Sequence, residues 1–137
     1  MNVGARRRAV AWLPVGLYMA VIWGVSSLGH PSVPVELFPF EDKGIHALEY
    51  GLLAVLVSHA VLRTWPSRGP IRLGAVAVLV TLGWGVMDEI HQAFVPGRSA
   101  DILDLVADAA GAAAGTVARV MFHLRRVRRV PPPTSTP

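Results

Sequence analysis

The stretch that decides the fold lies toward the C-terminal end and reads Asp108-Ala109-Ala110-Gly111-Ala112-Ala113-Ala114-Gly115. Small residues at this spacing let one helix backbone approach another closely, as in helix pairs inside membranes. The run belongs to a longer apolar segment, 102–124, whose first half carries aspartates. We therefore expect a helix that packs against other helices instead of facing lipid.

The composition of the whole chain indicates a membrane environment. Of its 137 residues, 53% are hydrophobic and 16% are charged, whereas about a quarter are charged in a typical soluble domain. With a mean hydropathy of +0.47, the chain is not an ordinary soluble globule. The absence of cysteine excludes disulfides, thiolate metal sites and cysteine nucleophiles. The arginines stand at the ends of apolar runs, which favours membrane orientation over nucleic-acid binding.

Four segments are apolar enough to cross a hydrocarbon core about 30 Å thick. They are 9–28, 45–62, 71–87 and 102–124. We predict an all-α fold, a four-helix transmembrane bundle with short loops, formed by one membrane domain over 1–130. The proline-rich segment 131–137 is predicted to be a disordered tail.

The charges predict an orientation for this bundle. Arginines precede the first span, surround the loop between spans two and three, and follow the fourth span. By the positive-inside rule these regions, and both termini, are cytoplasmic. Acidic residues contribute little to topology, yet all nine fall on or just inside the opposite, outer side. Their placement suggests chemistry at the outer face.

Two polar stripes begin at that face. On the second span Asp42, His46 and Glu49 stand at i, i+4 and i+7, and Lys43 and Tyr50 flank them. Residues at this spacing share one face of a helix. The spacing therefore predicts a polar stripe that descends into the bundle.

The fourth span repeats the pattern with Asp101, Asp104 and Asp108, and Gly111 and Gly115 continue the same face. A face that runs from acids into glycines points into the bundle. Asp108 then lies about 10 Å below Asp101 along the helix axis. An ionised acid near the bilayer centre costs about 2.5–3.5 kcal/mol on insertion scales, so such residues are functional candidates.

The third span ends in further polar residues, Asp88, Glu89 and Gln92. A turn predicted at Pro96-Gly97 brings Arg98 beside the acids of the third and fourth spans. The full predicted binding set comprises Asp42, Lys43, His46, Glu49, Tyr50, Asp88, Glu89, Gln92, Arg98, Asp101, Asp104 and Asp108. His46, Asp88 and Glu89 are also the candidates for catalysis.

Three ordered blocks in these segments resemble the VanZ-like family of bacterial integral membrane proteins. They read Asp42-Lys43-x-x-His46-x-x-Glu49-Tyr50-x-x-Leu53, Asp88-Glu89-x-x-Gln92-x-Phe94-x-Pro96-Gly97-Arg98, and Asp101-x-x-Asp104-x-x-x-Asp108-x-x-Gly111-x-x-x-Gly115. One departure is Asp108, where the family pattern usually has Asn. The resemblance implies a multi-pass protein of the bacterial cell membrane, and the family's named member is linked to reduced susceptibility to the lipoglycopeptide teicoplanin.

Several functions remain open at this stage. The favoured hypothesis is an acidic outer-face pocket that engages membrane lipid, a lipid-linked cell-wall component or a lipoglycopeptide. The alternative is an intramembrane hydrolase or transferase acting on a lipid-linked substrate of the outer leaflet. No cofactor is established, but the acids with His46 could hold a divalent cation. A structural ion-pair network explains the same charges without a ligand. Ion transport is disfavoured because no acid continues toward the cytoplasm.

Overall fold

The structure, a computed structural model, describes residues 3–28 and 41–129. It contains four helices: α1 (Val3–Ser26), α2 (Glu41–Thr64), α3 (Pro70–Gln92) and α4 (Ile102–Arg128). Each helix is long and apolar enough to cross a membrane, and the described residues contain no strand. The predicted all-α fold with four membrane-spanning helices is therefore confirmed.

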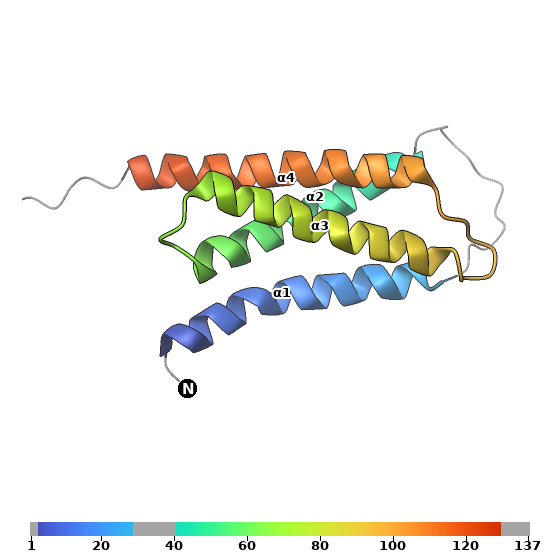
Figure 1. Ribbon diagram of the computed structural model, residues 1–137, viewed down its shortest axis with the longest axis horizontal. Helices are drawn as coiled ribbons and strands as arrows, with labels where there is room; N and C mark the ends of the chain where they lie inside the picture. The colour runs from blue at the N-terminus through green and yellow to red at the C-terminus, as the bar shows by residue number, and fades with distance from the viewer. Residues whose placement is uncertain (1–2, 29–40, 130–137) are drawn as a thin grey trace, which may run out of the picture.

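The helices run side by side, with α1 and α4 at opposite edges of the bundle (Figure 1). α1 packs on α2 and α3 and makes no contact with α4. The start of α1, the connection between α2 and α3, and the end of α4 lie together at one end of the molecule (Figure 1). We call this the basic end, and we call the opposite end, where α3 leads into α4, the acidic end. The side of the membrane that each end faces stays a prediction.

α2 and α4 form the tightest pair, and glycines are the reason. A Cβ atom added to Gly111 would lie 2.8 Å from the carbonyl carbon of Ala47, and one added to Gly115 would lie 2.9 Å from that of Gly51. Atoms cannot approach a rigid backbone so closely, so any larger residue would push the two helices apart. The predicted close approach of another helix at Gly111 and Gly115 is confirmed.

The apolar interior continues from these glycines along the facing sides of α1, α2 and α3. Ile22, Leu53, Val57 and Leu73 are fully or almost fully buried in it. Large apolar side chains also cover the outward faces, and Leu48 is 77% exposed. Lipid solvates such faces as well as protein does, so close fit between the helices holds the bundle together.

The helices are longer than the apolar runs that predict them. α2 begins at Glu41 and α3 continues to Gln92, because backbone hydrogen bonding continues through polar residues that a hydropathy criterion excludes. α1 instead ends at Ser26, two residues before the predicted limit. The turn at Pro96-Gly97 is confirmed, since Gly97 has a φ of 81° that other residues rarely adopt. The segment predicted as a tail, 131–137, lies outside the described residues.

Candidate functional site

The outermost layer of the acidic end joins the start of α2 to the start of α4. Lys43 donates from Nζ to Asp101 Oδ2 at 2.7 Å and also to Asp104 Oδ1. Asp101 is the N-cap of α4, because its other oxygen accepts from the backbone N–H of Leu103 at 2.8 Å. The Lys43 ammonium, helped by the Leu103 N–H, lowers the pKa of Asp101 below its ordinary value.

One helical turn deeper, His46 lies between two carboxylates of α4. Its Nδ1 is 3.1 Å from Asp108 Oδ1, and its Nε2 is 3.8 Å from Asp104 Oδ2. All three side chains are buried, and Asp108 is only 1% exposed. An ionised carboxylate can only accept a hydrogen bond, so with Asp108 ionised the Nδ1 atom of His46 carries the hydrogen.

α3 completes the group through Glu89. Its Oε2 accepts from the backbone N–H of Asp101 at 2.8 Å, which ties α3 to the first turn of α4. One ligand atom each from His46, Glu89 and Asp108 lies within 4.8 Å of the others, and these residues come from three different helices. We call the set Lys43, His46, Tyr50, Glu89, Asp104 and Asp108 the acidic cluster.

Several buried oxygens of this region have no hydrogen-bond partner among the described residues. They are Tyr50 Oη, Asp88 Oδ1, Glu89 Oε1 and Asp108 Oδ2. Leaving a buried polar group unpaired costs about 1–3 kcal/mol, and more when it is charged. Glu89 and Asp108, whose ligand atoms lie within 4.8 Å of each other, therefore mark a place where a further group can be bound.

Gly85 shows how space is kept beside these oxygens. A Cβ atom at this position would lie 3.1 Å from Asp108 Oδ2 and 3.2 Å from Tyr50 Cε1. Glycine therefore lets the backbone of α3 lie against the Asp108 carboxylate and the Tyr50 ring. Glu89 follows Gly85 by one helical turn on the same face of α3.

Asp88 forms a separate contact that includes α1. Its Oδ2 accepts from Ser26 Oγ and from Gln92 Nε2, both at 2.8 Å. All three side chains are buried. Sequence reasoning included Asp88 and Gln92 but missed Ser26, because a lone serine at the end of an apolar helix gives no periodic signal.

His91 lies in a second contact with α1 that the sequence did not predict. Its ring stacks on Trp23 with 4.0 Å between the centroids, and its Nε2 is 2.9 Å from Ser27 Oγ. Trp23 also contacts Trp84, at 5.7 Å between centroids. The sequence shows an aromatic residue in the first span and a histidine near the end of the third. Spacing within one helix does not reveal which residues of two separate helices meet.

The predicted stripe on α2 is rotated relative to the observed one. The sequence places Lys43 and Tyr50 at its flanks, yet both share the face of His46 that meets α3 and α4. Glu49, predicted at the centre, is only half-buried. The cause is geometric, since residues one position apart differ by about 100° around a helix and only the partner helix selects among them.

Arg98, which the sequence places beside the acids, is not brought into the acidic cluster. Arg98 is half-buried and within electrostatic range of Glu49, but it forms no ion pair with a described acidic side chain. The side chain of Asp42 lies outside the described part of the chain. The observed pairings of the acids are made with Lys43 and His46 instead.

The donor set of the acidic cluster suits a positively charged group. A buried imidazole with two carboxylates is a common ligand combination for divalent transition metals. An ammonium or guanidinium group could pair with the same unpartnered oxygens. Nucleophilic catalysis through an acyl-enzyme finds no support, because no serine or threonine belongs to the cluster and the chain has no cysteine.

Comparison with known proteins identifies the family. The family model described as VanZ/LLP1 matches residues 7–123, which include all four helices except their outermost residues. No curated protein and no solved structure matches the chain. Because the match covers most of the chain, the protein belongs to the VanZ/LLP1 family of membrane proteins.

Proposed function

We propose that the acidic cluster is a binding site for an amphiphilic or lipid-linked component of the bacterial cell envelope, reached from the outer leaflet. The observation that carries this proposal is the pair of buried carboxylate oxygens, one on Glu89 and one on Asp108, that have no hydrogen-bond partner among the described residues. A cationic group on the bound molecule, or a cation held between it and the protein, satisfies them. Binding of this kind contributes to resistance against lipoglycopeptides of the teicoplanin type.

The charge balance supports a site over a purely structural clamp. The acidic cluster contains three buried acids, Glu89, Asp104 and Asp108, whereas its bases are Lys43 and His46. A clamp needs about as many bases as acids, because each uncompensated buried charge destabilises the fold. A surplus of acids is expected where a ligand brings the missing positive charge.

A substitution at Glu89 distinguishes a binding role of the acidic cluster from a purely structural role. Glu89→Gln keeps an oxygen for the Asp101 N–H but removes the charge of the unpartnered oxygen. We expect a folded protein that no longer protects a bacterial strain, lacking its own family member, against a lipoglycopeptide. The control is Glu49→Gln, which removes one charge from a half-buried side chain outside the cluster.

The thermal stability of each purified variant is measured beside its protection of the strain. Loss of protection in Glu89→Gln at unchanged stability supports the site. Equal loss of stability and protection supports the clamp. Full protection by both variants rejects the proposed role of the cluster.

A second candidate function is favoured by the proximity of His46, Glu89 and Asp108, whose ligand atoms lie within 4.8 Å. These residues would hold a divalent metal in a hydrolase or transferase that acts on a lipid-linked substrate of the outer leaflet. A metal bound there would polarise the substrate or activate a water molecule. Elemental analysis of the protein purified without chelator tests this candidate, and His46→Ala must abolish any bound stoichiometric metal.

A further inference from the structure

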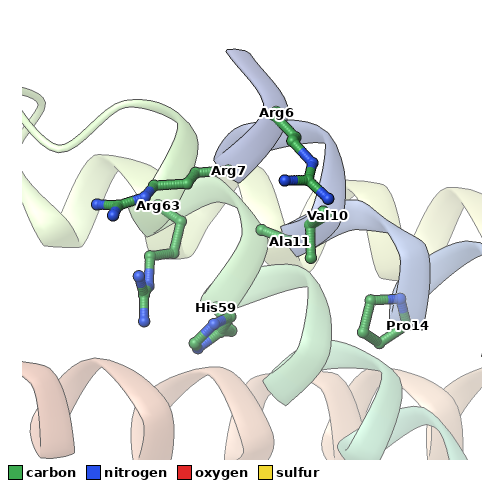
Figure 2. A pocket seen from close by; sticks show the side chains of 7 residues that line it. All are labelled: Arg6, Arg7, Val10, Ala11, Pro14, His59 and Arg63. Atoms are coloured by element: carbon green, nitrogen blue, oxygen red, sulfur yellow. The ribbon is translucent and has the colours of Figure 1, made fainter. Parts of the chain in front are cut away.

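The basic end carries two adjoining crevices, far from the acidic cluster. The first, about 420 Å³ in volume, lies between α1 and α2, and Figure 2 shows basic side chains of both helices around it. The second, about 370 Å³, lies between α2 and α4. His59 and Arg63 of α2 border both crevices, so the two form one continuous basic surface.

The charges of this surface have no carboxylate beside them among the described residues. Its described lining contains five arginines and two histidines and no carboxylate: Arg6, Arg7, Arg63, Arg119, Arg126, His59 and His123. Every acidic residue of the sequence lies between positions 36 and 108, and the described ones are at the acidic end. Arg119 follows Asp108 by eleven positions, which is about 16 Å along α4. These arginines are therefore available to pair with an anion from outside the chain.

Hydrogen bonding where the two crevices meet also indicates that donors are available to an anion. Arg119 Nη2 lies 3.1 Å from His59 Nδ1. A guanidinium group has donors only, so Nδ1 accepts, His59 is neutral in this pair, and its ring hydrogen is on Nε2. Arg119 Nη1 is buried without a partner among the described residues. Arg119 thus retains an N–H donor, on Nη1, that no described residue uses.

We propose that this basic surface binds the phosphate headgroup of an anionic phospholipid from the leaflet that surrounds the basic end. Phosphate oxygens only accept hydrogen bonds and carry the missing charge, which matches Arg63 and Arg119. Val10, Ala11 and Pro14 line the first crevice and Leu62 and Phe122 the second, so apolar walls adjoin the headgroup site for acyl chains. Basic pockets between transmembrane helices bind such headgroups. This site is independent of the function proposed for the acidic cluster.

The test uses the full chain in a neutral detergent, with dioleoylphosphatidylglycerol competing against dioleoylphosphatidylcholine and bound lipid counted by native mass spectrometry. We expect wild-type protein to retain the anionic lipid preferentially. Removing a crevice arginine should lower the preference about fivefold for each residue, so Arg63→Gln/Arg119→Gln should abolish most of it. The control Arg68→Gln/Arg72→Gln removes the same charge at the basic end from residues that line neither crevice.

Two outcomes would overturn the proposal. Equal losses in the crevice and control variants would mean that net charge alone attracts the lipid. Displacement of the lipid by millimolar inorganic phosphate, with thermal protection by phosphate as strong as by phosphatidylglycerol, would identify a free-anion site. If Arg119 variants fail to fold, Arg6→Gln/Arg7→Gln replaces them, since both residues are exposed and line the first crevice. An unchanged lipid preference in that variant would also reject the proposal.

Discussion

The two ends of the bundle use charge in opposite ways. At the acidic end Lys43 and His46 pair with Asp101, Asp104 and Asp108 across two helices. At the basic end five described arginines line open crevices and form no ion pair with a described carboxylate; Arg119 contacts His59 and the Phe122 ring. Charges at the first end therefore hold helices to one another, whereas charges at the second are directed at the surroundings. Charged residues thus have different roles at the two ends, depending on whether oppositely charged side chains of the protein lie beside them.

The largest expected effect concerns which side of the membrane each end faces. Because the arginine-rich segments are predicted to be cytoplasmic, a cysteine at Ser99 near the acidic end should react with an impermeant thiol reagent in intact cells. A cysteine at Ser67, in the connection at the basic end, should not react until the cells are permeabilised. Both positions are exposed in the structure, so the reverse pattern would overturn the orientation and the outer location of the site.

The next effect tests the glycine contact between the two ends. Gly115→Leu should destabilise the bundle by about 3 kcal/mol, because the side chain would meet the rigid backbone of Gly51. Gly83→Leu is the matched control, since a Cβ at Gly83 has open space. Unfolding in mixed detergent micelles measures both variants. Similar stability of the two would mean that α2 and α4 are not held in close contact.

Two single substitutions, one at each end, test the difference between the ends directly. Lys43→Met leaves the buried Asp104 without its ammonium partner and should cost about 1–3 kcal/mol of unfolding free energy. Arg63→Met removes a charge that has no carboxylate partner among the described residues, and it should change the stability by less than about 0.5 kcal/mol in neutral detergent. A reversed order would contradict the assignment of structural charge to the acidic end alone.

The smallest effect is a dependence on pH at the rim of the acidic end. The pKa of Asp101 is lowered by Lys43 and the Leu103 N–H, so its ionised form stabilises the fold above the unfolded pKa of about 3.9. That contribution is lost as the pH falls through the lower folded value. Asp101→Asn keeps the helix cap but removes the charge. The gap in melting temperature between wild type and Asp101→Asn should therefore narrow between about pH 5 and pH 3.

Much of the fold follows from the sequence because it depends on local pattern. The apolar runs predict the four helices, and the spacing of Gly111 and Gly115 predicts that another helix packs closely against this face of the fourth span. Within the site, the spacing of Asp104 and Asp108 predicts their common face, and the structure brings both to His46. In each case helical geometry alone decides the outcome.

The rest depends on how separate helices are rotated against one another. The central position of Tyr50 and the space left by Gly85 arise only when α2, α3 and α4 meet. The contacts of Ser26 and His91 depend in the same way on the rotation of α1, which has no polar stripe to fix it in advance. Single residues carry too little pattern to predict such rotations.

The attachment of α1 has a mechanical consequence. Ser26 Oγ donates to Asp88 at the last residue of α1, and Trp12 Nε1 donates to Thr64 Oγ1 at 2.9 Å closer to the middle of the helix. The two α1 residues that make these hydrogen bonds are fourteen positions apart, or about 21 Å along the helix axis. Hydrogen bonds at two such distant positions oppose both rotation of α1 about its axis and tilting of α1 away from α2 and α3. Displacing α1 from the bundle therefore breaks both of these hydrogen bonds.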